Sequence, residues 1–144
     1  MEASRPDPAQ LEVLIEVPRG GHTKPRPGRP TLRSPLPCPF NYGGAMHTRG
    51  PDGDLVDVVL LGPARPRGPA GAWPVVGRVD FWDAGRPDPK WICADHRPTP
   101  AEQALIWAFF RAYGLAKAAR DLARGRAPES GARGMAVWAP RAGA

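Results

Sequence analysis

The sequence predicts a mainly β fold with some α-helix: a small closed or nearly closed β-barrel of short strands, followed by one or two C-terminal helices. The chain of 144 residues holds 20 Pro and 17 Gly, weighted towards its first hundred residues. This composition favours short strands and many turns over a helical bundle. Hydrophobic residues alternate along short segments in that part, and they take helical spacing only after residue 99. The length is that of one domain.

Four segments have the pattern of β-strands. In the first, LEVLIEV, aliphatic residues recur at every second position, so that Glu16 falls on the face opposite to them. Residues 19–39 are too rich in Pro, Gly and basic residues to hold a helix, and we expect a loop or an irregular edge strand there. The four expected strands are residues 11–17, 55–62, 74–83 and 90–94.

A helix is expected to begin at the segment TPAE. Thr99 has the position of an N-cap, Pro100 stands at the first helical position, and Glu102 follows the cap by three residues. This is the pattern of a capping box, and an apolar run follows it. The residues expected to dock on the sheet are Ile106, Phe109, Phe110 and Tyr113.

The end of that helix is left open between two positions. It is expected to run from about 100 to 113, with a continuation after Gly114 as far as Arg124 as the longer alternative. We expect residues 1–125 to form the single domain. Residues 126–144 are expected to be a C-terminal tail, disordered or carrying a small packed segment at MAVW.

Charge and composition narrow the function classes. The net charge of +6 would suit a polyanionic partner, but the Arg residues are scattered and interrupted by Pro, so a nucleic-acid partner is not expected. No window of eighteen apolar residues and no signal-like N-terminus is present, which favours a cytoplasmic protein without a membrane contact. Cys38 and Cys93 lack zinc-site spacing and are expected to be reduced thiols rather than a disulfide.

Carboxylates are crowded in the segment DGDLVDVVLL. Two unit charges about 4 Å apart repel by about 4 kcal/mol at an effective dielectric constant near 20, so a counter-charge is expected among them. A second acidic segment, DAGRPDPK, follows the next expected strand, and strand-end loops of a small barrel can lie side by side. An all-oxygen pocket of this kind suits Mg²⁺. The carboxylates that could converge are Asp52, Asp54, Asp57, Asp83 and Asp88, with Glu16 as a further candidate.

Two other interpretations of these residues stay open. An Asp-Gly pair between apolar runs is also a common hairpin turn that needs no metal. The basic residues between the acidic segments are of the type that phosphoryl chemistry requires, because cations must neutralise the charge on phosphate. Each of them alone could equally be a solvated surface group. These basic residues are Lys24, Arg29, Arg33 and Lys90.

Five motifs, carried in order by four segments, resemble the soluble family I inorganic pyrophosphatases. IEVPRGGHTK is similar to that family's segment with a Glu and, eight residues on, a Lys. PFNYGGAMHTRGPDGDLVDVVLL is similar to its NYG segment running into the D-x-D-x-x-D signature. VVGRVDFWDAGRPDPKW matches its D-x-x-x-x-D-x-K element, and FFRAYG resembles its helix with an active-site Tyr. The resemblance covers about residues 11 to 113.

The resemblance implies a five-stranded OB-like β-barrel and Mg²⁺-dependent hydrolysis of pyrophosphate to two phosphates. It also implies that Asp54 is the base acting on the attacking water. By position, the implied metal ligands are Asp52, Asp57, Asp83, Asp88 and Glu16. The implied phosphate contacts are Lys24, Tyr42, Lys90 and Tyr113. Members of the family commonly form symmetric oligomers, so the resemblance implies a homo-oligomer as well.

The chain departs from the family pattern in its basic residues. Gly114 stands where a Lys usually follows the helix Tyr, and Arg26 replaces a Glu. The usual Arg position falls on Pro30, so Arg29, one place away, or Arg33 would have to contact phosphate instead. Lys117, one helical turn after Tyr113, is a second possible substitute.

Two other functions stay as alternatives. One is a divergent, non-catalytic or altered-substrate relative that binds diphosphate, a nucleotide or polyphosphate, for which the rearranged basic residues argue. The other is an OB-like nucleic-acid module, for which the charge and the five Trp argue. Convergent carboxylates would repel a nucleic acid, so we rank this function last.

Overall fold

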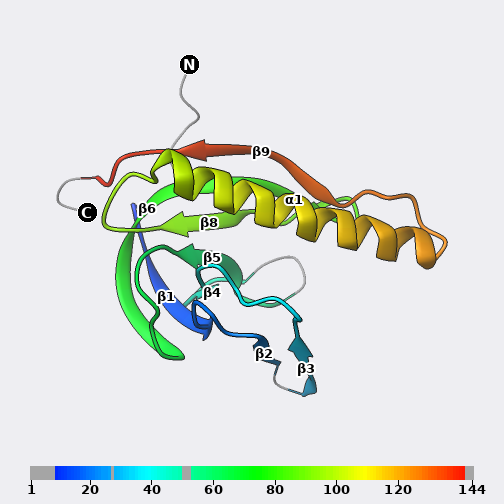
Figure 1. Ribbon diagram of the computed structural model, residues 1–144, viewed down its shortest axis with the longest axis horizontal. Coiled ribbons are helices and arrows are strands. Elements are labelled where there is room, and N and C mark those ends of the chain that lie inside the picture. Colours follow the sequence, from blue (N-terminus) through cyan, green and yellow to red (C-terminus); the bar gives the residue numbers. More distant parts are fainter. Residues whose placement is uncertain (1–8, 27, 50–52, 142–144) are drawn as a thin grey trace.

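The computed structural model describes residues 9–26, 28–49 and 53–141. The chain forms a seven-stranded sheet, a small two-stranded sheet and one long helix near the C-terminus (Figure 1). They are β1 (Gln10–Val17), β2 (Thr23–Arg26), β3 (Arg29–Arg33), β4 (Asn41–Ala45), β5 (Val56–Leu60), β6 (Gly68–Asp83), β7 (Arg86–Pro87), β8 (Lys90–Cys93), α1 (Pro100–Ala123) and β9 (Gly131–Val137).

Strands of the main sheet close into a ring. The order is β1, β4, β5, β8 and β6, and β6 pairs again with β1. This closure is possible because β6 has 16 residues, so that its first half pairs with β1 and its second half with β8 and β9. Neighbours are antiparallel except β5 and β8, which are parallel. The prediction of a mainly β, OB-like fold with a C-terminal helix is confirmed.

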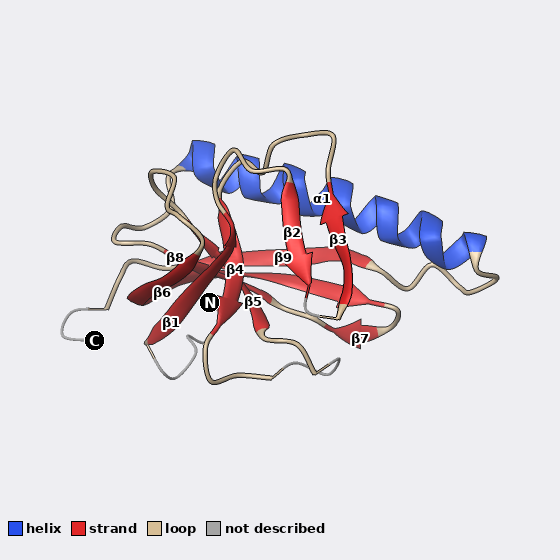
Figure 2. Cartoon of the chain, turned by 90° about the horizontal axis from the view of Figure 1, so that it is seen from below, coloured by secondary structure: helices blue, strands red, loops and turns tan. Residues whose placement is uncertain are grey.

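Each face of the sheet carries its own hydrophobic cluster, because successive side chains of a strand point to opposite faces. On β5, Val58 and Leu60 belong to one cluster and Val59 to the other. The cluster that contains Val59 also contains Ile106 and Phe110 of α1, so the helix covers that face. Figure 2 shows α1 lying lengthwise along the sheet.

The expected start of the helix is confirmed. Thr99 is the N-cap, its side chain accepts a hydrogen bond from the backbone N–H of Glu102, and the Glu102 carboxylate accepts one from Thr99. Of the residues expected to face the sheet, Ile106 and Phe110 are buried, Phe109 is half-buried, and Tyr113 keeps 38% of its surface exposed.

The helix follows the longer of the two alternatives and does not break at Gly114. Gly114 is buried, and a Cβ atom there would lie 2.7 Å from the Cα atom of Gly131. Only a glycine lets β9 pass so close to the helix. The chain therefore has Gly at this position for packing.

The segment beyond residue 125 contributes a strand to the sheet. β9 pairs with β6, and Trp138, directly after it, is 1% exposed. The expectation of a tail is corrected over residues 131–138, and MAVW is packed. The sequence signal was weak because β9 consists largely of Gly and Ala, which carry little of the hydrophobic pattern of a strand.

Of two further stretches, residues 19–39 follow the edge-strand alternative, and β4 is a strand that was not expected. Residues 19–39 contain the β2–β3 pair, and β4 follows. The glycines of β4 hid it, but they are needed there: a Cβ atom on Gly43 would lie 1.7 Å from the carbonyl oxygen of Leu14. Cys38 and Cys93 are both free thiols, and burial raises the pKa of Cys93 to about 12. Within the described residues, no helix is long and apolar enough to cross a membrane.

Candidate functional site

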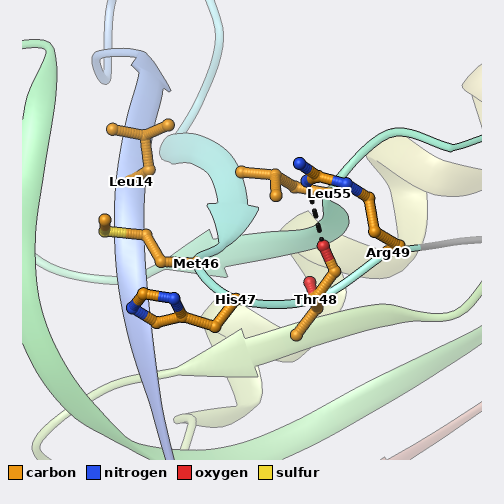
Figure 3. Close-up of a pocket in the computed structure, with 6 residues that line it drawn as sticks. All are labelled: Leu14, Met46, His47, Thr48, Arg49 and Leu55. Atoms are coloured by element: carbon orange, nitrogen blue, oxygen red, sulfur yellow. Dashed lines mark hydrogen bonds between the residues drawn. The ribbon is translucent and has the colours of Figure 1, made fainter.

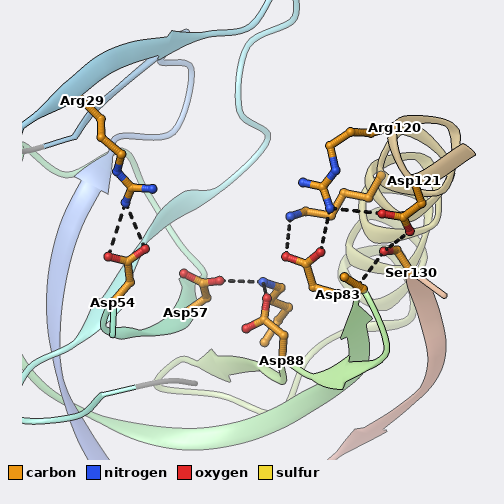
Figure 4. Close-up of polar contacts among 11 residues, drawn as sticks. Arg29, Asp54, Asp57, Asp83, Asp88, Arg120, Asp121 and Ser130 are labelled. Carbon is orange, nitrogen blue, oxygen red and sulfur yellow. Dashed lines mark hydrogen bonds and ion pairs between the residues drawn. The ribbon is translucent and has the colours of Figure 1, made fainter. Parts of the chain in front are cut away.

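Most of the expected site residues lie at neighbouring strand ends. Asp57 is on β5, Asp83 ends β6, and Lys90 begins β8. Because β5 and β8 are parallel neighbours with Val58 opposite Trp91, Asp57 and Lys90 are brought side by side. Figure 4 shows the carboxylates of Asp54, Asp57, Asp88 and Asp83 in a row below the β3 and α1 side chains. Asp52 lies outside the described residues.

The centre of this row is a buried lysine held by two carboxylates. Lys90 is 1% exposed, and its Nζ lies 2.5 Å from Asp57 Oδ2 and 2.8 Å from Asp88 Oδ2. Burial alone would lower the pKa of Lys90, but the two carboxylates raise it above its usual value. Lys90 therefore keeps its charge, and it offsets the repulsion between Asp57 and Asp88.

Tyr42 lies beside this group on β4. Burial raises the pKa of Tyr42 well above its usual value, and the charge of Asp57 raises it further. The phenol therefore stays protonated and can donate a hydrogen bond at any physiological pH. Lys24, from β2, has its Nζ 5.6 Å from the centre of the Tyr42 ring.

Glu16 joins the same group from β1. Its Oε2 lies 4.0 Å from Lys24 Nζ. Burial raises the pKa of Glu16 above its usual value, Lys24 opposes this shift, and the negative charges of Asp57 and Asp54 add to it. Glu16, Asp54 and Asp57 thus share one region of negative potential.

The carboxylates of this group fit a hard divalent cation, because every atom that they offer to a cation is an oxygen. A bound cation would reduce the electrostatic repulsion between these carboxylates. Across residues 9–26, 28–49 and 53–141, however, no three acidic, His or Cys side chains form a ready-made metal cluster. These carboxylates form ion pairs with lysine and arginine side chains instead.

Asp54 is the most open of the central carboxylates. Its side chain is 59% exposed and pairs with Arg29, whose Nη2 lies 3.2 Å from Asp54 Oδ2. Arg33 stands at the opposite end of β3, across from Thr23. Of Arg29 and Arg33, the two arginines that could contact phosphate, Arg29 is the one that contacts Asp54.

Asp83 belongs to a second group, on the side of α1. Lys117 Nζ lies 2.8 Å from Asp83 Oδ2, and Arg120 Nη2 lies 2.9 Å from Asp83 Oδ1. Burial would raise the pKa of Asp83, but the hydrogen bonds from Lys117 and Arg120 lower it below its usual value. Tyr113 connects the two groups, since its ring centre lies 5.9 Å from Lys90 Nζ and 5.1 Å from Lys117 Nζ.

Three members of this second group were missed by sequence analysis. Arg120 also reaches the buried Asp121, and Ser130 donates a hydrogen bond of 2.7 Å to Asp121 Oδ2. The Ser130 hydroxyl in turn accepts one from the backbone N–H of Ala84. These bonds join the end of β6, the helix and the approach to β9. No sequence signal marked them, because residue 130 was placed in a tail.

A separate surface hollow of about 400 Å³ holds none of the expected site residues (Figure 3). The Thr48 hydroxyl in its wall donates to the Ala45 carbonyl and accepts from the Val56 N–H. His47 Nε2 lies 3.3 Å from Glu12 Oε2. These polar contacts fix the position of the chain next to β4 and β5, so the polar groups in the wall of the hollow have a structural role.

Comparison with known proteins identifies the family. The sequence model of the family described as inorganic pyrophosphatase matches residues 13–106. The chain belongs to this family. Membership makes it a hydrolase of the inorganic diphosphatase class. The matched region contains the Asp57–Lys90–Asp88 group and ends before Tyr113, Gly114 and Lys117. The comparison with curated proteins gives no match.

Solved structures of pyrophosphatases share the fold. The inorganic pyrophosphatase of Neisseria gonorrhoeae superposes with a TM-score of 0.64 at 22% identity, over 95% of this chain and 87% of that one. The enzyme of Thermus thermophilus gives 0.62 at 22% identity, with the same coverage of 95% and 87%. That of Helicobacter pylori gives 0.64 at 22% identity, over 95% and 89%.

Proposed function

We propose that this chain hydrolyses inorganic pyrophosphate to two phosphates with Mg²⁺ as its cofactor. The observation that carries the proposal is the buried Lys90 between Asp57 and Asp88, beside a protonated Tyr42. A surface hairpin turn would not need a buried cation. The arrangement matches what a phosphate-transfer site requires, namely carboxylates for cations and fixed donors for phosphate oxygens.

Asp57 and Asp88, together with Asp52, are the residues that would hold Mg²⁺, with Glu16 beside them. Asp83 would contribute to ions that arrive with the substrate. Bound there, Mg²⁺ would neutralise charge on the pyrophosphate and lower the pKa of a water molecule.

Asp54 is proposed as the general base. It is exposed to solvent, unlike Asp57, so a water molecule can reach its carboxylate. Arg29 holds this carboxylate in place through the hydrogen bonds of its Nη2 atom. A pyrophosphate that approaches Asp54 would meet the same Arg29 guanidinium.

The phosphate oxygens would be bound by donors from three sides of the site. Tyr42 offers a hydroxyl that stays protonated, and Lys24 lies next to its ring. Tyr113 lies on the helix side. Lys90 is enclosed by its two carboxylates, and it would donate to phosphate only as cations take over those carboxylates.

Lys117 is proposed to supply the positive charge that Gly114 cannot. Packing against Gly131 excludes any side chain at position 114. Lys117 lies one turn further along α1, beside the Tyr113 ring and on Asp83. Its ammonium group therefore stays at the edge of the site, although its helix position differs from the family pattern.

A second candidate function is supported by the same ion pairs. Asp54, Asp57, Asp83 and Asp88 all have basic partners within the protein. A relative that binds diphosphate, a nucleotide or polyphosphate without hydrolysing it could keep its carboxylates neutralised in this way.

Phosphate release from pyrophosphate in the presence of Mg²⁺ tests the proposal, with Asp54→Asn as the matched variant. We expect release by the parent and a loss of about 10²- to 10⁴-fold in the variant, the range of general-base catalysis. Equal rates for parent and variant would contradict the role of Asp54. No release by a folded parent that binds pyrophosphate would favour the second candidate.

A further inference from the structure

Arg120 lies between two carboxylates, one from β6 and one from its own helix. Its Nη2 is 2.9 Å from Asp83 Oδ1 and 3.5 Å from Asp121 Oδ1. The two carboxylates differ in exposure, since the side chain of Asp83 is 30% exposed and that of Asp121 is 1% exposed. Figure 4 shows Asp83 on the side of the carboxylate row and Asp121 on the other side of Arg120. The guanidinium therefore faces the site, and one of its counter-charges is buried behind it.

The guanidinium of Arg120 has unused hydrogen-bonding capacity. It carries five N–H groups, and both contacts with carboxylates are made by Nη2. Nε is buried and has no hydrogen-bond partner in the described part of the chain. An unsatisfied buried donor is unfavourable, so a ligand that supplies another acceptor would be favoured here. The side chain as a whole is 35% exposed, so an anion can reach it from solvent.

Ser130 fixes both ends of the Arg120–Asp83 pair. Its hydroxyl donates a hydrogen bond of 2.7 Å to Asp121 Oδ2 and accepts one of 2.9 Å from the backbone N–H of Ala84. Ala84 directly follows Asp83 and has a φ of 51°, which residues other than glycine rarely adopt. One hydroxyl thus holds the carboxylate beside Arg120 and the backbone beside Asp83.

We propose that Arg120 is a further phosphate-binding residue of this site, and that Asp121 and Ser130 are the residues that position it. The inference rests on the proposed function, in which Asp83 contributes to ions that arrive with the substrate. Asp121 keeps the guanidinium at the edge of the site whether or not Asp83 is engaged in this way. Arginine suits the task because its planar fork can bind two phosphate oxygens at once.

Lys117 shares the same carboxylate and supports this role. The two cations contact different oxygens of Asp83, Lys117 at Oδ2 and Arg120 at Oδ1. Of the counter-charges in this group, Asp83 is open to solvent and Asp121 is enclosed. The part of the group that solvent reaches is therefore positive on balance, which favours the approach of an anion.

The assignment of Arg120 does not come from the family pattern, because the family model ends at residue 106. It depends on the course of α1 beyond Gly114, where the next turns bring Lys117 and then Arg120 to Asp83. The chain then returns through Ser130 towards β9. The longer helix thus supplies two basic side chains to this end of the site.

Calorimetric titration with methylenediphosphonate, a diphosphate analogue whose bridge cannot be hydrolysed, tests the role of Arg120 in buffer that contains Mg²⁺. We expect Arg120→Met to weaken binding by about ten- to a hundredfold, the value of one charge-assisted contact. Arg111→Met is the matched control, because Arg111 is an exposed arginine of the same helix, and it should bind like the parent. Urea denaturation should show that both variants are folded.

A double-variant cycle tests the positioning role of Asp121. We expect Asp121→Asn to weaken binding by about two- to tenfold, the cost of ordering one side chain on binding, and to have no further effect in the Arg120→Met background. Ser130→Ala, a milder change, should behave in the same way, whereas Ser130→Thr keeps the hydroxyl and should bind like the parent. An equal loss from Asp121→Asn in both backgrounds would overturn the positioning role.

The outcomes separate this inference from the proposed hydrolysis. An Arg120→Met variant that binds methylenediphosphonate like the parent would overturn the inference, whatever the rate of hydrolysis. A parent that binds through Arg120 but releases no phosphate from pyrophosphate would support the inference and contradict only the hydrolysis. A folded parent that does not bind the analogue would overturn both.

Discussion

The two ion-pair groups of the site differ in how much water reaches them. In the first, the side chain of Lys90 is 2% exposed and lies between Asp57 and Asp88. In the second, the side chains of Lys117 and Arg120, which hold Asp83, are 16 and 35% exposed. Removing one member of a buried pair leaves an uncompensated charge, whereas solvent replaces much of a more exposed pair. Removing an ion-pair partner should therefore lower mainly the stability of the protein in the first group and mainly its activity in the second.

The sharpest test of this comparison is Lys90→Met. It leaves Asp57 and Asp88 close together without their shared cation, so we expect the free energy of unfolding to fall by about 3–5 kcal/mol. Urea denaturation in the presence of a chelator measures it. Arg29→Met is the control, because the Arg29–Asp54 pair is exposed and its loss should cost only about 0–1 kcal/mol. Equal costs for the two variants would remove the distinction.

Lys117→Met tests the functional role of the second group. If Lys117 replaces the lysine that the family has at position 114, the variant loses one charge-assisted contact of about 1.5–3 kcal/mol. Turnover of pyrophosphate should then fall by about ten- to a hundred-and-fifty-fold. Arg124→Met, a charge-matched change beyond the helix end, should leave turnover unchanged. An unchanged rate in Lys117→Met would remove the lysine from the mechanism.

Gly114→Ala tests why the chain departs from the family pattern. Alanine is better than glycine in a helix by about 1 kcal/mol, but its Cβ would lie 2.7 Å from Gly131 Cα. Overpacking of this kind costs about 1–3 kcal/mol, so we expect a net loss of stability in urea denaturation. A stabilised variant would show that β9 yields at this point and that packing does not explain the glycine.

The smallest expected effect is the contribution of Asp83 to stability. Its folded-state pKa lies below its usual value, so its stabilising contribution is present above the pKa of the unfolded chain and is lost as pH falls through the folded-state pKa. Asp83→Asn should therefore cost about 0.5–1 kcal/mol at neutral pH and nothing in strong acid. Urea denaturation at the two pH values measures this, and a cost that persists in acid would point to packing instead.

The residues of the first group could be named from the sequence, as could Asp83 and Lys117 of the second, but the rest of the second group could not. Asp57, Asp88 and Lys90 lie in short motifs that carry their own spacing, and adjacent strands bring them together. Arg120, Asp121 and Ser130 meet Asp83 only because the helix continues past Gly114 and β9 returns beside it. β4 and β9 were missed because their Gly and Ala residues carry little of a strand's hydrophobic pattern. In β4, Gly43 and Gly44 also serve close approaches, which such a pattern does not record.

Calorimetric titration with Mg²⁺ in the absence of pyrophosphate tests the central claim most directly, since it compares the two groups in one experiment. If Asp57 holds the cofactor and Asp83 serves only ions that come with substrate, Asp57→Asn should weaken Mg²⁺ binding by about tenfold or more, and Asp83→Asn should bind like the parent. Unchanged binding in Asp57→Asn, or an equal loss in both variants, would contradict the assignment of the metal site to the Asp57–Lys90–Asp88 group.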